Sequence, residues 1–154
     1  MKLGQQELER MIASQYLEPC PPDPAGASAL ISKARTHHRT AAALASTDPE
    51  IAADALHAGN RKALEAVLLA RGLRPTKLGG HLASFEAVTA MLGGNGVLRV
   101  YNVVRRVRHE GDYSSASFDV QPDDIEDNLD DSEAMVDACE KMIPLVPPFV
   151  NGRA

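Results

Sequence analysis

Residues 47–50, Thr-Asp-Pro-Glu, constrain the fold most, because they separate two long stretches that both have the apolar spacing of a helix. Asp48 can cap the helix that follows, and Pro49 fits the first helical position, where no N–H is needed. This helix is predicted to extend to about Arg71, where Gly72 can end it. The segment therefore predicts two long helices joined by a short turn, as in an antiparallel pair.

The same Asp-Pro signal recurs upstream at Asp23-Pro24, and it predicts that the earlier long helix extends from there to about Ser46. Before it, residues 3–17 are predicted to form a short helix, which the proline-rich segment 19–24 ends because proline lacks an amide donor. Alanine is abundant and aromatic residues are few, which favours closely packed helices.

The rest of the chain continues this alternation of helices and turns. It is predicted to contain, in order, a loop (72–80), a short helix (81–92), a glycine-rich turn (93–96), a helix (98–113), a polar loop (114–121) and a last helix from Pro122 to about Ile143. No strand is strongly indicated. We predict an all-α fold, an up-and-down antiparallel bundle of four main helices with a short N-terminal helix and one short inserted helix. Its parts are an N-terminal helix with a proline-rich linker (1–21), the bundle (22–146) and a C-terminal tail (147–154).

The helix predicted over residues 98–113 carries the densest positive charge in the chain. One face is apolar and consists of Val97, Val100, Tyr101, Val104 and Val107. Much of the rest is filled by Arg99, Arg105, Arg106, Arg108 and His109, and the eleven residues from 99 to 109 contain no acid. At helical spacing Arg105 lies beside Arg108, and Arg108 lies four residues before Asp112.

The negative charge is concentrated in a different segment. The chain has 16 Lys and Arg residues against 21 Asp and Glu residues, but residues 119–140 hold ten of the acids and no Lys or Arg. Subtracting those ten acids leaves 11 acids and 16 basic residues elsewhere, so an acidic pI near 5.5 conceals a basic region. The acidic run is interpreted as a solvated helix face, with an alternative role as the electrostatic partner of the arginine helix.

Several classes of site are not expected. Cys20 and Cys139 lack a CxxC spacing, which argues against structural zinc and favours reduced thiols in a cytoplasmic protein. No apolar run approaches 18 residues and no signal peptide is evident, so no membrane span is expected. Adjacent His37 and His38 face different directions on their helix and cannot form a two-ligand metal site. We expect neither a metal nor a cofactor.

With these helices placed, the sequence resembles the HEPN family, small helical-bundle domains of prokaryotic toxin–antitoxin and defence systems that are fused to or paired with minimal nucleotidyltransferases. The resemblance covers nearly the whole chain and looks closest to an actinobacterial-type subgroup. It is carried by the leader LERMI (8–12), the third helix and its loop (47–76), GGH (79–81), RRVRHEGDY (105–113) and the last helix (122–143).

One position departs from the family pattern. In the ribonuclease members an arginine is followed by a polar residue, three variable residues and a histidine; here Arg108 and His109 fit, but Tyr113 stands in the histidine position. A ribonuclease that uses no metal needs a base near neutrality, and tyrosine titrates near pKa 10 where histidine titrates near 6.5. The resemblance therefore implies a HEPN scaffold whose nuclease site is modified or lost, and the chain leans away from being an enzyme.

Three functions remain open on the sequence. The first is a binding module, in which a homodimer forms a basic cleft for RNA or a nucleotide from Arg99, Arg105, Arg106, Arg108, His109, Asp112 and Tyr113. The second is a ribonuclease toxin in which Arg108 stabilises charge and His109 acts as base. The third is a toxin or antitoxin subunit that pairs with a partner protein such as a nucleotidyltransferase, with Tyr113 as a modification site.

Overall fold

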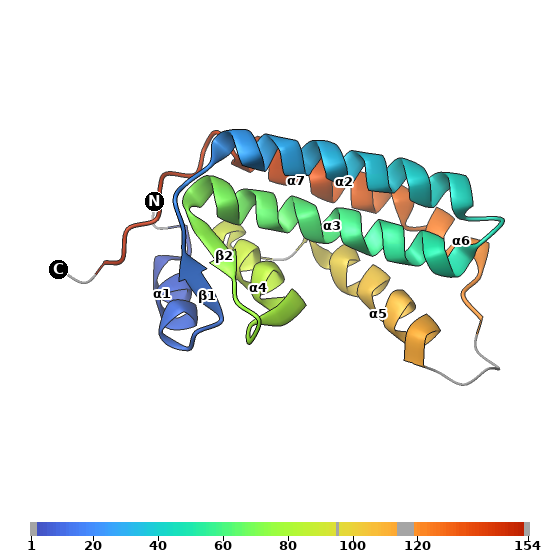
Figure 1. Cartoon of the computed structure of the whole chain (residues 1–154), viewed down its shortest axis with the longest axis horizontal. Coiled ribbons are helices and arrows are strands. Elements are labelled where there is room, and N and C mark those ends of the chain that lie inside the picture. The colour runs from blue at the N-terminus through green and yellow to red at the C-terminus, as the bar shows by residue number, and fades with distance from the viewer. Residues whose placement is uncertain (1–2, 95, 114–118, 153–154) are drawn as a thin grey trace.

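The computed structural model describes residues 3–94, 96–113 and 119–152, with the backbone alone for His81 and residues 110–113. The elements in chain order are α1 (Gln5–Ala13), β1 (Leu17–Pro19), α2 (Pro24–Leu44), α3 (Pro49–Arg71), β2 (Leu73–Pro75), α4 (Gly80–Leu92), α5 (Arg99–Tyr113), α6 (Pro122–Glu126) and α7 (Leu129–Met142). The predicted all-α bundle is confirmed: α2 and α5 run opposite to α3 and α7, with α4 inserted below α3 (Figure 1). None of the helices over these described ranges is both long enough and apolar enough to span a membrane.

The two Asp-Pro segments begin their helices as predicted. A carboxylate oxygen of Asp23 accepts a hydrogen bond from the Gly26 amide at 2.8 Å, and Asp48 accepts one from the Ile51 amide at 3.3 Å. Each bond satisfies an N–H of the first turn that has no partner within the helix. At the other end of α3, Gly72 has φ 89°, the left-handed conformation that ends a helix at little cost for glycine.

Helix α3 is the centre of the molecule, because α2, α4, α5, α6 and α7 all pack against it. Small residues bring α2 and α3 close together. At Gly59, an added Cβ would lie 2.7 Å from the His38 ring and 2.9 Å from the Ala34 carbonyl oxygen, so only glycine fits this crossing. Leucines of α3, among them Leu56 and Leu64, are fully buried in the resulting core.

The sequence did not predict the small antiparallel sheet of β1 and β2, which lies where a helix end and a loop were expected. Leu17 pairs with Pro75 and Pro19 with Leu73. The first helix ends at Ala13, well before residue 17, and Gln15 takes a positive φ of 65° before the strand. Three-residue strands are too short to show an alternating pattern, and the two strands are separated in the sequence by α2 and α3.

The last predicted helix is two helices, α6 and α7. The side-chain amide of Asn128 donates a hydrogen bond to the Asp124 carbonyl oxygen at 2.8 Å. Such local bonding by asparagine competes with the helical pattern and favours a break at this point. Of the polar loop predicted over 114–121, residues 114–118 lie outside the described part of the chain.

The C-terminal tail lies along α1 and the end of α3. The Phe149 amide donates to the Arg71 carbonyl oxygen at 2.7 Å, and the Arg71 guanidinium lies 5.5 Å from the centre of the Phe149 ring. Arg71 also donates to the Leu3 carbonyl at 2.8 Å, and the Gln5 side chain donates to the Val150 carbonyl at 2.8 Å. Both ends of the described chain are thus held against the same end of the bundle.

Candidate nucleic-acid interface

The apolar face predicted for the arginine helix anchors α5 on α3 and α4. Val100, Tyr101 and Val104 are buried, whereas Val97 is 38% exposed. The Tyr101 ring stacks on Phe85 with centroids 5.6 Å apart and lies 5.3 Å from the His57 ring. Burial raises the pKa of Tyr101 to about 12, so its phenol stays protonated at neutral pH. The fixed apolar face determines where the arginines of α5 point.

Those arginines separate onto two sides of α5. Arg108 forms an ion pair with Asp54 of α3, with its Nε 3.1 Å from the carboxylate oxygen. Arg105, half-buried, places its Nε 3.5 Å from the Asn102 side-chain oxygen. Arg99 instead lies toward α7, where it lines a cavity of about 220 Å³ with Asp131. Arg106 and His109 are exposed. The sequence predicts all these residues as one ligand-binding site, and that grouping stays a prediction.

Arg108 pairs with Asp54 of α3, an acid that the spacing within the arginine helix does not point to. The side chains of Asp112 and Tyr113 lie outside the described residues, so the expected neighbourhood of Arg108 and Asp112 stays a prediction. The acidic last helix pairs with α2: Arg35 contacts Asp137 at 2.9 Å and Glu140 at 2.7 Å. Sequence spacing finds partners one turn away on the same helix, whereas these partners come from neighbouring helices.

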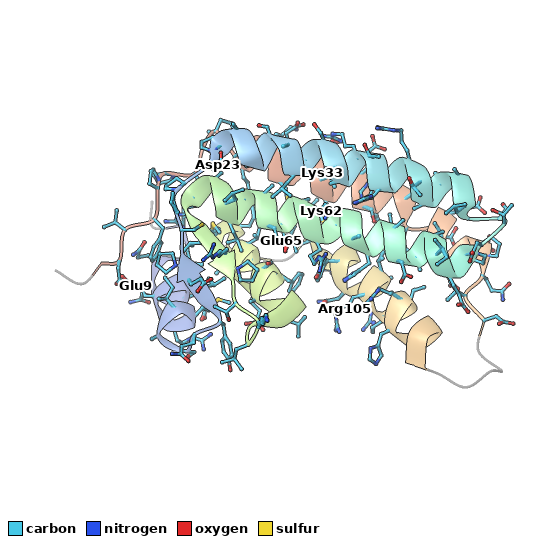
Figure 2. The ribbon with its side chains drawn as sticks, viewed as in Figure 1. Glu9, Asp23, Lys33, Lys62, Glu65 and Arg105 are labelled. Carbon is cyan, nitrogen blue, oxygen red and sulfur yellow. The ribbon has the colours of Figure 1, made fainter. Side chains whose placement is uncertain are left out.

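Basic residues of α2 and α3 join Arg105 and Arg108. The charges of Lys33, Arg61 and Lys62 lower the pKa of His37, after the larger effect of burial, which places these four groups close together. Arg61 also acts on the Tyr101 phenol, as do Arg105 and Arg108. We call this set the basic surface; it comprises Lys33, His37, Arg61, Lys62, Arg105 and Arg108. Figure 2 shows Lys33, Lys62 and Arg105 succeeding one another across α2, α3 and α5.

The sequence does not predict that basic residues of α2 and α3 belong to the site, because these residues form no motif. Their spacing in the sequence nevertheless indicates that they lie close together. In an antiparallel pair, residues equally far from the turn lie side by side, and Lys33 precedes the turn by about as many residues as Lys62 follows it. Lys33 and His37 are also four residues apart and share one face of α2.

Two acids moderate the charge of the basic surface. Asp54 pairs with Arg108, and Glu65 lies one turn after Arg61 on α3. The Arg108–Asp54 side chains are 37% and 43% exposed, so the pair is screened by water and contributes about 0–1 kcal/mol to stability. The surface is therefore basic on balance but not uniformly so.

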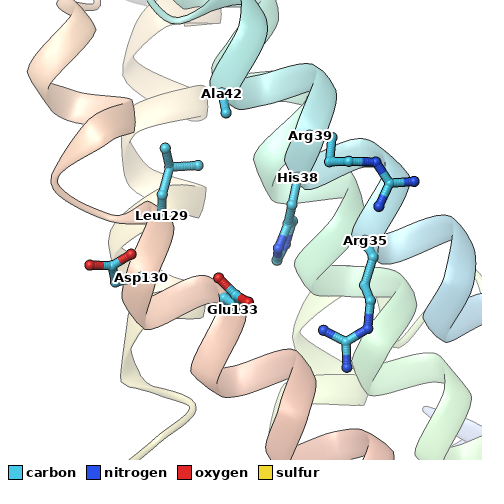
Figure 3. A pocket seen from close by; sticks show the side chains of 7 residues that line it. All are labelled: Arg35, His38, Arg39, Ala42, Leu129, Asp130 and Glu133. Atoms are coloured by element: carbon cyan, nitrogen blue, oxygen red, sulfur yellow. The ribbon is translucent and has the colours of Figure 1, made fainter.

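A different cavity, of about 320 Å³, lies between α2 and α7 (Figure 3). Arg35, Arg39 and His38 line one side of it, and Asp130 and Glu133 the other. Here Arg35 is already neutralised by the acids of α7, and the charges are balanced. This cavity therefore offers an anionic ligand little net attraction.

A buried polar chain beside this cavity joins three helices. The His38 Nε2 lies 2.9 Å from the Asn60 side-chain oxygen, and the Asn60 amide donates to the Ser132 hydroxyl at 3.0 Å. Asn60 and Ser132 are fully buried, so these bonds satisfy groups that would be costly to leave unpaired. Their role is structural. Among the residues with described side chains, no three His, Cys, Asp or Glu residues are grouped as a metal site requires.

No protein-family model matches the sequence, and neither the curated proteins nor the solved structures include a match to the chain. The HEPN resemblance thus stays a prediction from the sequence. The features of the structure that bear on function are the basic surface, its neighbouring acids and the cavities around it.

Proposed function

We propose that this chain is a HEPN-like RNA-binding protein, non-catalytic or weakly catalytic, that acts in a prokaryotic toxin–antitoxin or defence system as the resemblance implies. The observation that carries the proposal is the basic surface, on which five Lys and Arg side chains from α2, α3 and α5 gather around His37 in a protein with a net charge of −5. Binding to nucleic-acid phosphates draws its affinity from such clusters of Lys and Arg.

The basic surface is better suited to contact the phosphate backbone of an RNA than to recognise its bases. Arg61 and Arg105 offer guanidinium groups, which pair well with phosphate oxygens, and Lys62 adds a flexible point charge. The α5 helix that carries Arg105 is packed onto its neighbours through the buried Tyr101, whose ring stacks on Phe85. The acidic residues of α6 and α7 repel RNA from the other side and orient its approach.

The ribonuclease alternative is less well supported. Tyr113 occupies the position where the family carries histidine, and the Nε of Arg108 is engaged by Asp54. His109 is the substitute base that the sequence suggests, but it precedes Tyr113 by about one helical turn. An error of even ~1 Å can cost ~10²-fold in an in-line attack, so a shift by a whole turn removes most of the rate.

The test is fluorescence anisotropy with a labelled single-stranded RNA, measured over a range of salt concentrations. The double variant Arg61→Ala, Lys62→Ala should bind at least ~10-fold more weakly, and its salt slope should fall by about 0.7 for each phosphate that the protein no longer neutralises. A matched control, Arg10→Ala, Arg39→Ala, removes the same charge from exposed side chains of α1 and α2 that bond only to local partners. Equal binding by the two double variants would show that the basic surface is not the RNA site.

A further inference from the structure

A cavity of about 370 Å³ opens between α3, the turn after β2 and the first turn of α4. Arg61 lines this cavity and also belongs to the basic surface, so the two are continuous. We call it the α4 pocket; the lining residues that matter here are Arg61, Glu65, Lys77, Gly80 and Ser84. Its volume lies within the range of pockets that hold small ligands.

Two cations at the α4 pocket are available to an anion. The Nε of Arg61 is shielded from solvent and has no hydrogen-bond partner among the described side chains. Lys77 is exposed, and neither it nor Arg61 forms an ion pair within the described part of the chain. Helix α4 begins at Gly80 without a side-chain cap, so the positive end of its dipole adds to these charges.

Ser84 adds a hydroxyl to the wall of the α4 pocket. The residue is 1% exposed and lines the pocket, and its hydroxyl is not among the atoms that are fully shielded from solvent without a partner. The small part of Ser84 that solvent reaches therefore faces the pocket, where its hydroxyl can donate to a ligand. At Gly80, φ is +60° and an added Cβ would meet no atom within 4 Å, which leaves the backbone open to close approach.

Glu65 restricts the chemistry of the ligand. Its half-buried carboxylate lines the same pocket and forms no ion pair with a described residue, so a bare inorganic anion is repelled. A ribose hydroxyl can donate to such a carboxylate, as in nucleotide sites that read the 2′-hydroxyl. The pocket thus suits a molecule that has a phosphate at one end and a hydroxyl donor a few ångströms away.

We infer that the α4 pocket binds the phosphorylated terminal nucleotide of an RNA strand whose following phosphates lie on the basic surface. A terminal phosphate carries about −1.5 to −2 charges at neutral pH, more than a backbone diester, and so gains most from Arg61, Lys77 and the α4 dipole. Ser84 donates to the phosphate, and Glu65 accepts from the ribose. The inference rests on the proposed RNA binding and adds a preference for RNA strands that carry a terminal phosphate.

The experiment compares single-stranded RNAs of one sequence that carry a 5′-phosphate, a 3′-phosphate or hydroxyls at both ends, each labelled internally. We expect one phosphorylated RNA to bind about 10-fold more tightly than the hydroxyl form, an advantage of ~1.4 kcal/mol. Lys77→Gln and Ser84→Ala should remove this advantage and leave the affinity for the hydroxyl form unchanged. Arg105→Ala should weaken the binding of all three RNAs alike, and Lys141→Gln is the charge-matched control for Lys77→Gln.

The outcomes separate this inference from the proposed function. If the wild-type protein bound all three RNAs equally and Arg105→Ala weakened all three, the pocket assignment would be overturned and the proposed RNA binding would stand. Failure of every RNA to bind would overturn both. A nucleoside monophosphate that binds as tightly as the phosphorylated RNA would overturn the strand-end assignment in favour of a free nucleotide. Because Lys77 is exposed, Lys77→Gln keeps the test valid if Ser84→Ala fails to fold.

Discussion

Tyr113 is the residue on which the catalytic question depends, since it replaces the histidine of the resembled family. We expect the wild-type protein to leave single-stranded and structured RNA uncleaved in EDTA, because loss of a general base costs about 10²–10⁴-fold. Tyr113→His should introduce cleavage, while His109→Ala should change nothing measurable. Gel analysis of labelled RNA checks this. Robust wild-type cleavage that His109→Ala abolishes would contradict it.

Gly59 sits where α2 and α3 approach most closely. Gly59→Ala should destabilise the protein by about 1–3 kcal/mol, because the new methyl group overlaps the His38 ring and the Ala34 carbonyl and outweighs the better helix propensity of alanine. Urea unfolding measures the change. Gly94→Ala is the control: a Cβ there meets no atom within 4 Å, so its effect should stay within about 0.5 kcal/mol. Similar losses in both variants would disprove the close crossing.

His38 gives the fold a dependence on pH. Burial lowers the pKa of His38 below its ordinary 6.5; nearby Arg35 and His37 also lower it, and Asn60 and Glu133 partly oppose the shift. The unfolded chain then binds a proton at higher pH than the folded chain, so stability is complete above about pH 6.5 and falls as the pH drops toward the folded pKa.

His38→Gln should therefore lose less stability than wild type between about pH 7.5 and about pH 5.5 in urea titrations. His37, whose pKa is also lowered, keeps part of the dependence in the variant. An identical pH profile in the two proteins would mean that His38 is not neutral in the fold.

At the scale of elements, the junction of α3 and α5 is set by Asp54 and Arg108. Asp54→Asn should change stability by less than about 1 kcal/mol, because the ion pair is exposed to water. It should also strengthen RNA binding by a few-fold, since it removes a negative charge beside Arg108 and leaves the helices in place. Anisotropy and urea unfolding give the two values, and Glu50→Gln on the same helix is the charge-matched control. Weaker RNA binding in Asp54→Asn would show that the acid positions Arg108 for the ligand.

The sequence predicts most helices but not which residues of different elements contact one another. Periodicity and caps located α2, α3, α4 and α5 to within a few residues, because those signals are local. The β1–β2 pairing and the Arg108–Asp54 contact depend on residues that lie more than fifty positions apart, and no local pattern encodes them. For the same reason the arginine helix was predicted as a site, whereas Arg61 and Ser84 were not.

At the scale of the whole molecule, the basic surface and the exposed apolar residues bear on how two copies of the chain associate. We expect a homodimer with twofold symmetry, in which the α5 helices of two copies face each other as the HEPN resemblance implies. An apolar cavity of about 630 Å³ lies elsewhere, between the ends of α4 and α7, where Leu92 is 41% and Leu145 76% exposed. Light scattering at micromolar concentration should give twice the mass of the chain.

The variant Leu145→Asp distinguishes the two possible dimer interfaces, the α5 face and the apolar cavity. It should leave the dimer intact if the copies meet through α5, and it should dissociate the dimer if they meet through the apolar cavity. A strict monomer in the wild type would contradict the dimer altogether. Because the basic surface includes Arg105 and Arg108 of α5, dimerisation through α5 should also make RNA affinity rise with protein concentration.

The short turn between α2 and α3 has a consequence for the order of events during synthesis. A turn of a few residues closes with little loss of entropy, and contacts that are local in sequence form early in folding. Lys33, His37, Arg61 and Lys62 all belong to this hairpin, while Arg105 and Arg108 emerge from the ribosome later. Once residues 24–71 have left the ribosome, the nascent chain therefore already carries four of the six residues of its basic surface.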